Sequence, residues 1–187
     1  GLIERYNNGN RFKLLSTFLS PPEENEPVEV GSGEEQYSQA EKFYHGDGET
    51  ENKEAAFALY KQAAEQGHAE AQYMLGVMYN NGEAVEEDEA KAFQWISLSA
   101  EQDCIDAWYY LGLLYNEGWG VPEDKEKAVE WYTKAAEEGH SDAQLNLGYA
   151  LYVGQGIEED LDEALVWITK SAMQENEDAK EFLAQLE

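Results

Sequence analysis

The chain lacks the covalent and apolar features that define several classes of protein. It has one cysteine, Cys104, in 187 residues, so no disulfide can form within the chain. No apolar run approaches the roughly 20 residues that a membrane-spanning helix needs. The longest run near the start, Leu14 to Leu19, is interrupted by Ser16 and Thr17. These absences exclude a disulfide-framed domain and predict that the chain does not insert into a membrane.

Basic residues are scarce as well. Lys and Arg number 12 against 40 Asp and Glu, a formal net charge of −28 at pH 7, and no arginine follows Arg11. Nucleic-acid binding depends on neutralising phosphates with Lys and Arg, so we expect this surface to repel nucleic acid and anionic membranes. A cationic protein would instead be attracted, mainly through faster association. The same acidity can serve solubility alone, and the sequence leaves both interpretations open.

A repeat of 36 residues runs through most of the chain. The clearest series are Ala71, Ala107, Ala143 and Ala179; Leu75, Leu111, Leu147 and Leu183; Gly76, Gly112 and Gly148; and Trp95, Trp131 and Trp167. A constant period of about 20 to 50 residues is typical of solenoids, in which each unit buries its apolar face against its neighbours. Because solenoids mostly bind other macromolecules, the period indicates a class of function without identifying a partner.

Each unit is predicted to contain two helices. In the unit 70–104, the first helix should run from about Glu70 to Asn80 and end at Gly82, and the second should follow Asp88. The residues equivalent to Asp88 in the other units are Asn52, Asp124 and Asp160. Their side chains can accept hydrogen bonds from the free amides of the first helical turn, so we interpret all four as N-caps.

These signals divide the chain into three parts. Residues 1–20 are predicted to form an amphipathic helix, and residues 21–33 an acidic linker containing Pro and Gly. Residues 34–187 form the repeat region, with units at 34–68, 70–104, 106–140 and 142–176 and a capping helix at 177–187. The expected fold is all-α: an α-solenoid of about four 36-residue helix-turn-helix repeats, with an N-terminal helix and a C-terminal capping helix.

The N-terminal segment has two open interpretations. Its apolar stripe consists of Phe12, Leu15, Phe18 and Leu19. The stripe can cover the exposed end of the first repeat, or it can tether a partner or support self-association with a second copy.

Two strings carry a more specific pattern: Ala107-Trp-Tyr-Tyr-Leu-Gly-Leu-Leu-Tyr-Asn-Glu-Gly-Trp-Gly-Val121 and Ala128-Val-Glu-Trp-Tyr-Thr-Lys-Ala-Ala136. The pattern resembles the Sel-one-like repeat, a relative of the tetratricopeptide repeat, and the resemblance covers residues 34–187 with a degraded first copy. It implies a concave groove lined by the first helices and a role as an adaptor or scaffold. It implies no catalytic residues, and we expect no cofactor.

The glycine-rich loops and acidic runs do not indicate a ligand site. Gly118 and Gly120 belong to a Gly-x-Gly loop, but no Gly-Lys-Ser/Thr follows, so we interpret the loop as a bend between helices. The acidic run from Glu86 to Glu89 lacks the spacing of a calcium-binding loop. Its position predicts the start of a second helix, where carboxylates favour the positive end of the helix dipole.

His68, His140 and Cys104 occupy one position of the repeat, after the end of a second helix. The two histidines lie two units apart, too far to share a metal ion, and we expect them to be exposed. Cys104 has no arranged histidine partner, so we expect an exposed free thiol without a catalytic role. The sequence therefore predicts neither a metal site nor a catalytic site.

The first helices supply the candidate binding surface. By analogy with tetratricopeptide grooves, the concave positions are Tyr37, Tyr44, Tyr73, Val77, Asn80, Tyr109, Leu113, Asn116, Leu145, Tyr149 and Tyr152. Tyr and Asn combine contact area with a polar tip, as is typical of recognition surfaces, although packing within helix pairs also uses Tyr. A row of helix-start acids that includes Glu70, Asp106 and Asp142 would line the rim, or would only stabilise the helices.

The leading interpretation is a non-enzymatic scaffold, adaptor or inhibitor that holds a basic protein or peptide in a Tyr-lined, acidic groove. The resemblance extends this to toxin-neutralising partners and envelope regulators. Two alternatives stay open: a hydrolase acting on cell-wall or β-lactam-type substrates, and a DNA-mimicking inhibitor. We expect a soluble protein of the bacterial cytoplasm or periplasm, with partner identity and oligomeric state beyond the sequence.

Overall fold

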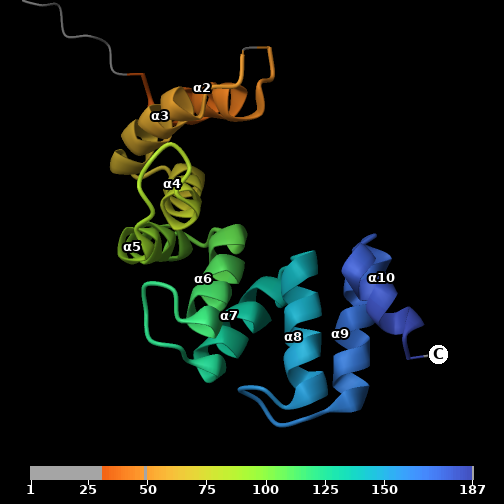
Figure 1. Ribbon diagram of the computed structural model, residues 1–187. Helices are drawn as coiled ribbons and strands as arrows, with labels where there is room; N and C mark the ends of the chain where they lie inside the picture. The colour runs from red at the N-terminus through yellow and green to blue at the C-terminus, as the bar shows by residue number, and fades with distance from the viewer. Residues whose placement is uncertain (1–30, 49, 187) are drawn as a thin grey trace, which may run out of the picture. The chain divides into compact units, whose positions relative to one another are not determined.

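The computed structural model describes residues 31–48 and 50–186. Every regular element in this part of the chain is an α-helix (Figure 1). The helices are α2 (Gly33–His45), α3 (Lys53–Glu65), α4 (Ala69–Asn81), α5 (Glu89–Ala100), α6 (Ile105–Glu117), α7 (Lys125–Glu137), α8 (Ser141–Val153), α9 (Leu161–Met173) and α10 (Glu177–Ala184). The helix predicted over residues 1–20 lies outside the described residues, and α2 begins at Gly33, the last residue of the predicted linker. None of these described helices combines the length and apolar character needed to cross a membrane.

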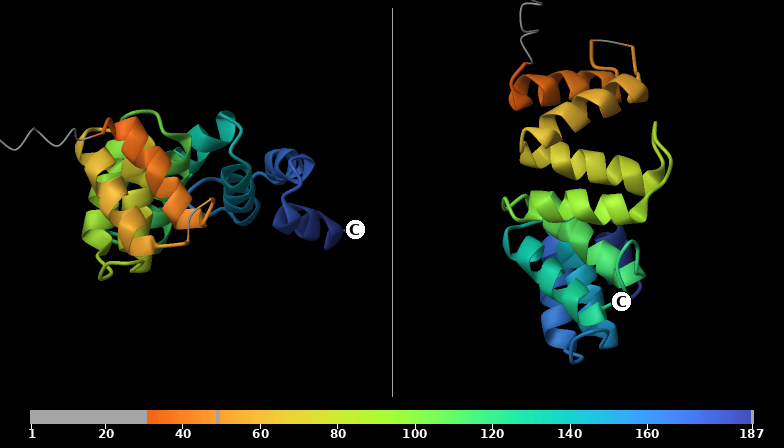
Figure 2. Two further views of the ribbon diagram at one scale, coloured as in Figure 1. Left: turned by 90° about the horizontal axis from the view of Figure 1, so that it is seen from above. Right: turned by 90° about the vertical axis from the view of Figure 1, so that its left-hand side faces the viewer.

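The helices pack in the order of the chain. α2 pairs with α3, α4 with α5, α6 with α7 and α8 with α9, and each second helix also packs on the first helix of the next unit. The right-hand view of Figure 2 shows the orange-to-green helices α2 to α5 as successive layers. The α-solenoid predicted from the 36-residue period is therefore confirmed.

The predicted N-caps are confirmed at every second helix. The side chains of Asn52, Asp88, Asp124 and Asp160 each accept the backbone N–H of the residue three positions later, at 2.9 to 3.0 Å. Asp103 and Glu175 stand where other units have glycine, yet both adopt left-handed backbone with φ of 61° and 64°. The stack therefore imposes this turn even where a side chain makes the conformation unfavourable.

Two glycines show why the repeat tolerates no side chain at certain positions. A Cβ at Gly112 of α6 would lie 2.4 Å from the ring of Tyr132 in α7, so glycine allows these paired helices to approach closely. Gly120 has φ of 68°, and a Cβ there would lie 2.1 Å from the backbone oxygen of Glu89 in the preceding repeat. The Gly-x-Gly loop joins α6 and α7 as the predicted bend between helices, and it also packs against the preceding repeat, which was not predicted.

Candidate functional site

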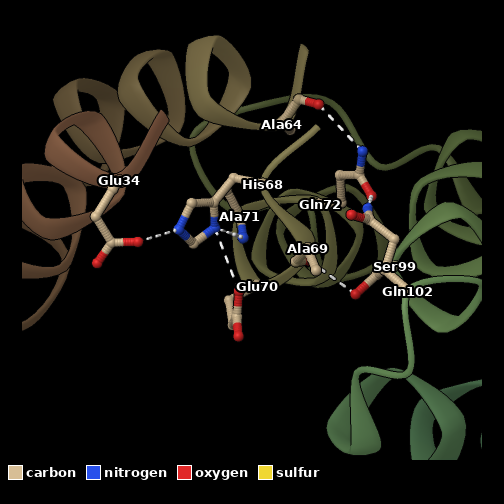
Figure 3. Close-up of polar contacts among 9 residues, drawn as sticks. All are labelled: Glu34, Ala64, His68, Ala69, Glu70, Ala71, Gln72, Ser99 and Gln102. Atoms are coloured by element: carbon tan, nitrogen blue, oxygen red, sulfur yellow. Dashed lines mark hydrogen bonds and ion pairs between the residues drawn. The ribbon is translucent and has the colours of Figure 1, made fainter. Parts of the chain in front are cut away.

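Histidine side chains join successive repeats, and the first of these joints lies between α2 and α4. His68 caps α4, because its Nδ1 accepts the N–H of Ala71 at 3.3 Å, while its Nε2 lies 2.9 Å from the carboxylate of Glu34 in α2 (Figure 3). Since Nδ1 accepts, the ring proton lies on Nε2 and is donated to Glu34. The ring also stacks on Tyr37, with centroids 4.6 Å apart.

The same joint recurs between α6 and α8. Nδ1 of His140 accepts the N–H of Ala143 at 3.2 Å, Nε2 lies 3.4 Å from Asp106, and the ring stacks on Tyr109 at 4.5 Å. The hydrogen bond from His140 lowers the pKa of the Asp106 carboxyl below its ordinary 3.8. The side chains of His68 and His140 are only 13% and 15% exposed. The expectation of exposed histidines was therefore wrong, because each ring is enclosed between a tyrosine and the next helix.

Ser32 caps α2, and the corresponding positions before α6 and α10 hold Cys104 and Asn176. Asn176 reproduces the histidine joint: its Oδ1 accepts the N–H of Ala179 at 3.0 Å, and its Nδ2 donates to Asp142 at 2.7 Å. The Cys104 side chain caps nothing. Its thiol is free but partly buried, which corrects the expected full exposure. The joint before α6 therefore lacks a side-chain cap that the joints before α4, α8 and α10 possess.

A buried glutamine row, which the sequence interpretation missed, also connects the repeats. Gln72 is 5% exposed; its Nε2 donates to the backbone oxygen of Ala64 at 3.1 Å, and its Oε1 accepts from Gln102 at 2.7 Å (Figure 3). Gln144 makes the equivalent contacts with Ala136 and Gln174. In the intervening repeat, Nε1 of Trp108 donates to Ala100 instead. The available signal was the spacing of the glutamines: Gln36 and Gln72 are one 36-residue period apart, and Gln144 follows Gln72 by two periods.

The predicted groove residues differ in exposure. Tyr149 is exposed, and the partly buried ones are Tyr37, Tyr44, Tyr73, Val77, Asn80, Tyr109, Leu113, Asn116, Leu145 and Tyr152. The rim acids Glu70, Asp106 and Asp142 are exposed. Much of the Tyr37 and Tyr109 rings is engaged by the capping histidines, and burial raises the pKa of both phenols to about 12. Their hydroxyls consequently stay protonated near neutral pH.

The structure gathers three of the predicted residues around one cavity. Leu113 and Asn116 of α6 and Tyr149 of α8 line a hollow of about 270 Å³ whose lining also includes Tyr132 of α7. Tyr149 is 48% exposed, and the hollow also has side-chain amides in its lining. The arrangement offers an aromatic face beside hydrogen-bonding amides, which suits recognition of a polypeptide.

Other predicted residues lie away from that cavity. In α4, Nδ2 of Asn80 donates to the Tyr110 hydroxyl at 3.3 Å, while its buried Oδ1 has no hydrogen-bond partner among the described residues. Tyr44 in α2 donates to Glu83 at 3.0 Å. The Tyr152 ring in α8 packs edge-on against Phe182 of α10, with centroids 5.2 Å apart. The candidate residues therefore form separate contacts along the first helices rather than one pocket.

Comparison with known proteins identifies the family. The family model described as Sel1 repeat matches residues 37–68, 69–104, 105–140 and 141–176. The chain belongs to the Sel1 repeat family. Proteins of this family generally mediate protein–protein interactions. No match was found among curated proteins.

Solved structures of Sel1 repeat proteins share the fold. A Sel1 repeat protein from Oxalobacter formigenes is 33% identical with a TM-score of 0.75, and the matched region covers 79% of this chain and 59% of that protein. A protective antigen of uropathogenic Escherichia coli that displays an SLR fold is 35% identical with a TM-score of 0.74, covering 80% and 32% respectively. Helicobacter pylori cysteine-rich protein B is 26% identical with a TM-score of 0.55, covering 71% and 95%. This chain thus spans less than two thirds of the first two relatives.

The Sel1 repeats also form a hollow on the side of the second helices. It measures about 420 Å³ and is lined by Phe93 of α5, Leu111 of α6 and Trp131 of α7. Lys134 lies over the Trp131 ring, with Nζ 4.8 Å from the centroid. This hollow is larger than the cavity between α6, α7 and α8, but its lining includes none of the residues predicted to line a groove. Within residues 31–48 and 50–186, no group of His, Cys, Asp and Glu could hold a metal ion.

Proposed function

We propose that this Sel1 repeat protein binds a basic protein or peptide along its first helices and carries out no chemistry of its own. The observation that supports this most is the cavity of about 270 Å³ between α6, α7 and α8. It brings Leu113 and Asn116 of α6 together with Tyr149 of α8, the next first helix, which lies more than 30 residues further along the chain. Residues at this spacing suit a partner segment that runs across neighbouring repeats.

The chemistry of the cavity suits a polypeptide. The side-chain amides of Asn116 and Asn146 line the cavity, and although Nδ2 of Asn116 donates to Glu117 at 2.6 Å, an amide has two donor hydrogens and an acceptor oxygen, which a peptide backbone can use. Tyr149, about half exposed, presents an aromatic ring that can be covered by a partner side chain. Burial of such a ring, surrounded by weaker polar contacts, typically supplies most of the binding energy of an interface.

Charge supports a basic partner. Asp106 and Asp142 are exposed at the helix starts on the same first helices. Lys125, the cation in the cavity lining, lies 3.3 Å from Glu123, so its charge is largely compensated. Association should therefore be steered electrostatically and weaken with salt. Inhibition of a basic toxin or regulation of an envelope protein would both use such a surface.

Affinity capture with matched variants tests the proposal. Wild type, Tyr149→Ala and the control Leu98→Ala are used as bait in extract of the native organism, and bound proteins are identified by mass spectrometry after low-salt and high-salt washes. Tyr149 and Leu98 are 48% and 43% exposed and lie on a first and a second helix, respectively. We expect a basic protein that is retained by wild type and Leu98→Ala at low salt and lost from Tyr149→Ala.

Two results would contradict this function. Equal capture by all three baits would place the binding site away from Tyr149. Displacement of the captured protein by added DNA, with Tyr149→Ala behaving like wild type, would show that the acidic surface imitates DNA instead.

A further inference from the structure

The first helices of successive repeats meet through aromatic side chains at two of their joints. Tyr110 of α6 reaches Asn80 of α4, whose Nδ2 donates to the Tyr110 hydroxyl at 3.3 Å. Phe182 of α10, two 36-residue periods after Tyr110, packs against Tyr152 of α8 with ring centroids 5.2 Å apart. Asn80 and Tyr152 are also two periods apart. At both joints, an aromatic side chain of the later helix therefore contacts the same position of the earlier helix.

The joint between α6 and α8 carries an asparagine instead. Asn146 stands one period after Tyr110 and one period before Phe182. Its side-chain amide hydrogen-bonds to the hydroxyls of Tyr109 and Tyr132. The cavity of about 270 Å³ lies at this joint, and Asn146 is part of its lining. Since a cavity of about 150 Å³ is enough to admit benzene, the space at this joint has room for one aromatic side chain.

Tyr132 of α7 is a wall of this cavity and does not fill it. Its equivalents at the two aromatic joints are the smaller Ile96 and Ile168. The Tyr132 ring packs against Gly112 of α6 and is only 4% exposed, yet it still lines the cavity. Tyr149, which is about half exposed, lines the cavity as well, so the cavity is open to solvent. A side chain of a partner can therefore enter where Tyr110 and Phe182 lie at the other joints.

The lining favours a phenol. Asn116 is the equivalent of Asn80; its Nδ2 donates to Glu117 at 2.6 Å, and an amide nitrogen has a second hydrogen that can meet a phenol hydroxyl. The exposed carboxylate of Glu117 disfavours an acidic side chain in the cavity and favours a basic residue beside the aromatic one. We propose that this cavity receives a tyrosine side chain of the basic partner, an assignment that rests on the function proposed above.

Binding of p-cresol, the side-chain analogue of tyrosine, tests this subsite without the partner. The probe is titrated into the isotopically labelled full chain, and the side-chain amide signals of Asn116 and Asn146 are followed by NMR. We expect saturable shifts with a dissociation constant of about 1 to 10 mM, as suits a ligand of this size. n-Butylammonium, the analogue of a lysine side chain, should shift these two signals with at least about tenfold weaker affinity.

Two variants locate the bound probe. The filled variant, Tyr132→Ile with Asn146→Tyr, copies the pair of Ile96 and Tyr110 at the earlier joint. The open variant is Tyr132→Ile alone, which enlarges the cavity and keeps Asn146. Circular dichroism checks that both remain helical. We expect the filled variant to bind p-cresol at least about tenfold more weakly than wild type, and the open variant to bind it at least as tightly.

Three results would overturn the subsite: equal p-cresol binding by wild type and the filled variant, shifts of wild type confined to residues outside the cavity, or tighter binding of n-butylammonium. If the filled variant lost its helicity, the wild-type shifts at Asn116 and Asn146 would still decide. Failure of the proposed function is distinguishable, because capture of a basic protein through Tyr149 does not require that this protein inserts a tyrosine. A failed capture would overturn that function, while p-cresol binding would still measure the subsite.

Discussion

Replacement of His140 by alanine tests whether the capping histidines hold successive repeats together. The variant loses a helix cap worth about 1 kcal/mol, a ring stack on Tyr109 worth about 0.5 to 1.5 kcal/mol, and a pair with Asp106 worth at most about 0.5 kcal/mol because that carboxylate is exposed. We expect the free energy of unfolding to fall by about 2 kcal/mol.

Asparagine at the same position separates these contributions. Asn176 shows that asparagine can both cap the following helix and donate to the acid of the preceding repeat. His140→Asn should therefore retain the cap and the pair, lose only the stack, and be destabilised by about 1 kcal/mol. Cys104→Asn should gain about 1 kcal/mol, because the cysteine provides no side-chain cap.

Urea denaturation followed by circular dichroism measures these differences in stability. Amide hydrogen exchange at Ala143 reports on the joint directly, because the N–H of Ala143 donates its hydrogen bond to Nδ1 of His140. Exchange is needed because repeat stacks can unfold in parts. If His140→Asn proved as unstable as His140→Ala, the cap and pair would contribute nothing. If His140→Ala matched wild type, the joint would not stabilise the stack at all.

Other contacts predict further effects. Gln144→Leu should cost about 1 to 2 kcal/mol, because it removes the buried hydrogen bonds of Gln144 with Ala136 and Gln174, although the Ala136 carbonyl still accepts the N–H of Gly139. Leu at the exposed Gln94 should change stability by less than about 0.5 kcal/mol in the same denaturation assay. Gly120→Ala should cost at least about 1 kcal/mol in thermal unfolding, because of its positive φ and the Glu89 oxygen. The pKa of the Asp106 carboxyl is below its ordinary 3.8 in the folded state. The stability that its ionised form contributes is therefore complete above pH 3.8 and is lost as the pH falls through the folded-state pKa. Asp106→Asn lacks this contribution at every pH, so it should lose less stability than wild type when the pH falls from neutral to that range.

The repeat architecture could be predicted from the sequence because its physical causes are local and periodic. Asx residues at Asn52 and Asp88 cap helices through their own side chains, and Gly112 allows the close approach of a helix from the same repeat. Such signals depend on residues a few positions apart or one helix away. The 36-residue period then repeats each of them.

The contacts between repeats were harder to predict because they depend on three-dimensional neighbours. A histidine after a helix-ending glycine favours an exposed position, yet His68 is enclosed by Tyr37 and the start of α4. Gln72 belongs to a residue type that is mostly exposed, but it is buried in the stack, where its side chain hydrogen-bonds a carbonyl at the end of α3 and a second glutamine. Tyr149 is exposed, whereas the other predicted groove residues are partly buried, and no local sequence pattern around Tyr149 indicated this difference.

The measurement that tests the central claim most directly is the affinity of a captured partner for wild type and Tyr149→Ala at low and high salt. Binding through the groove predicts that salt weakens the wild-type complex and that Tyr149→Ala binds at least about tenfold more weakly at either salt concentration. Equal affinities for the two proteins, with no dependence on salt, would contradict the claim that a basic segment binds along the first helices.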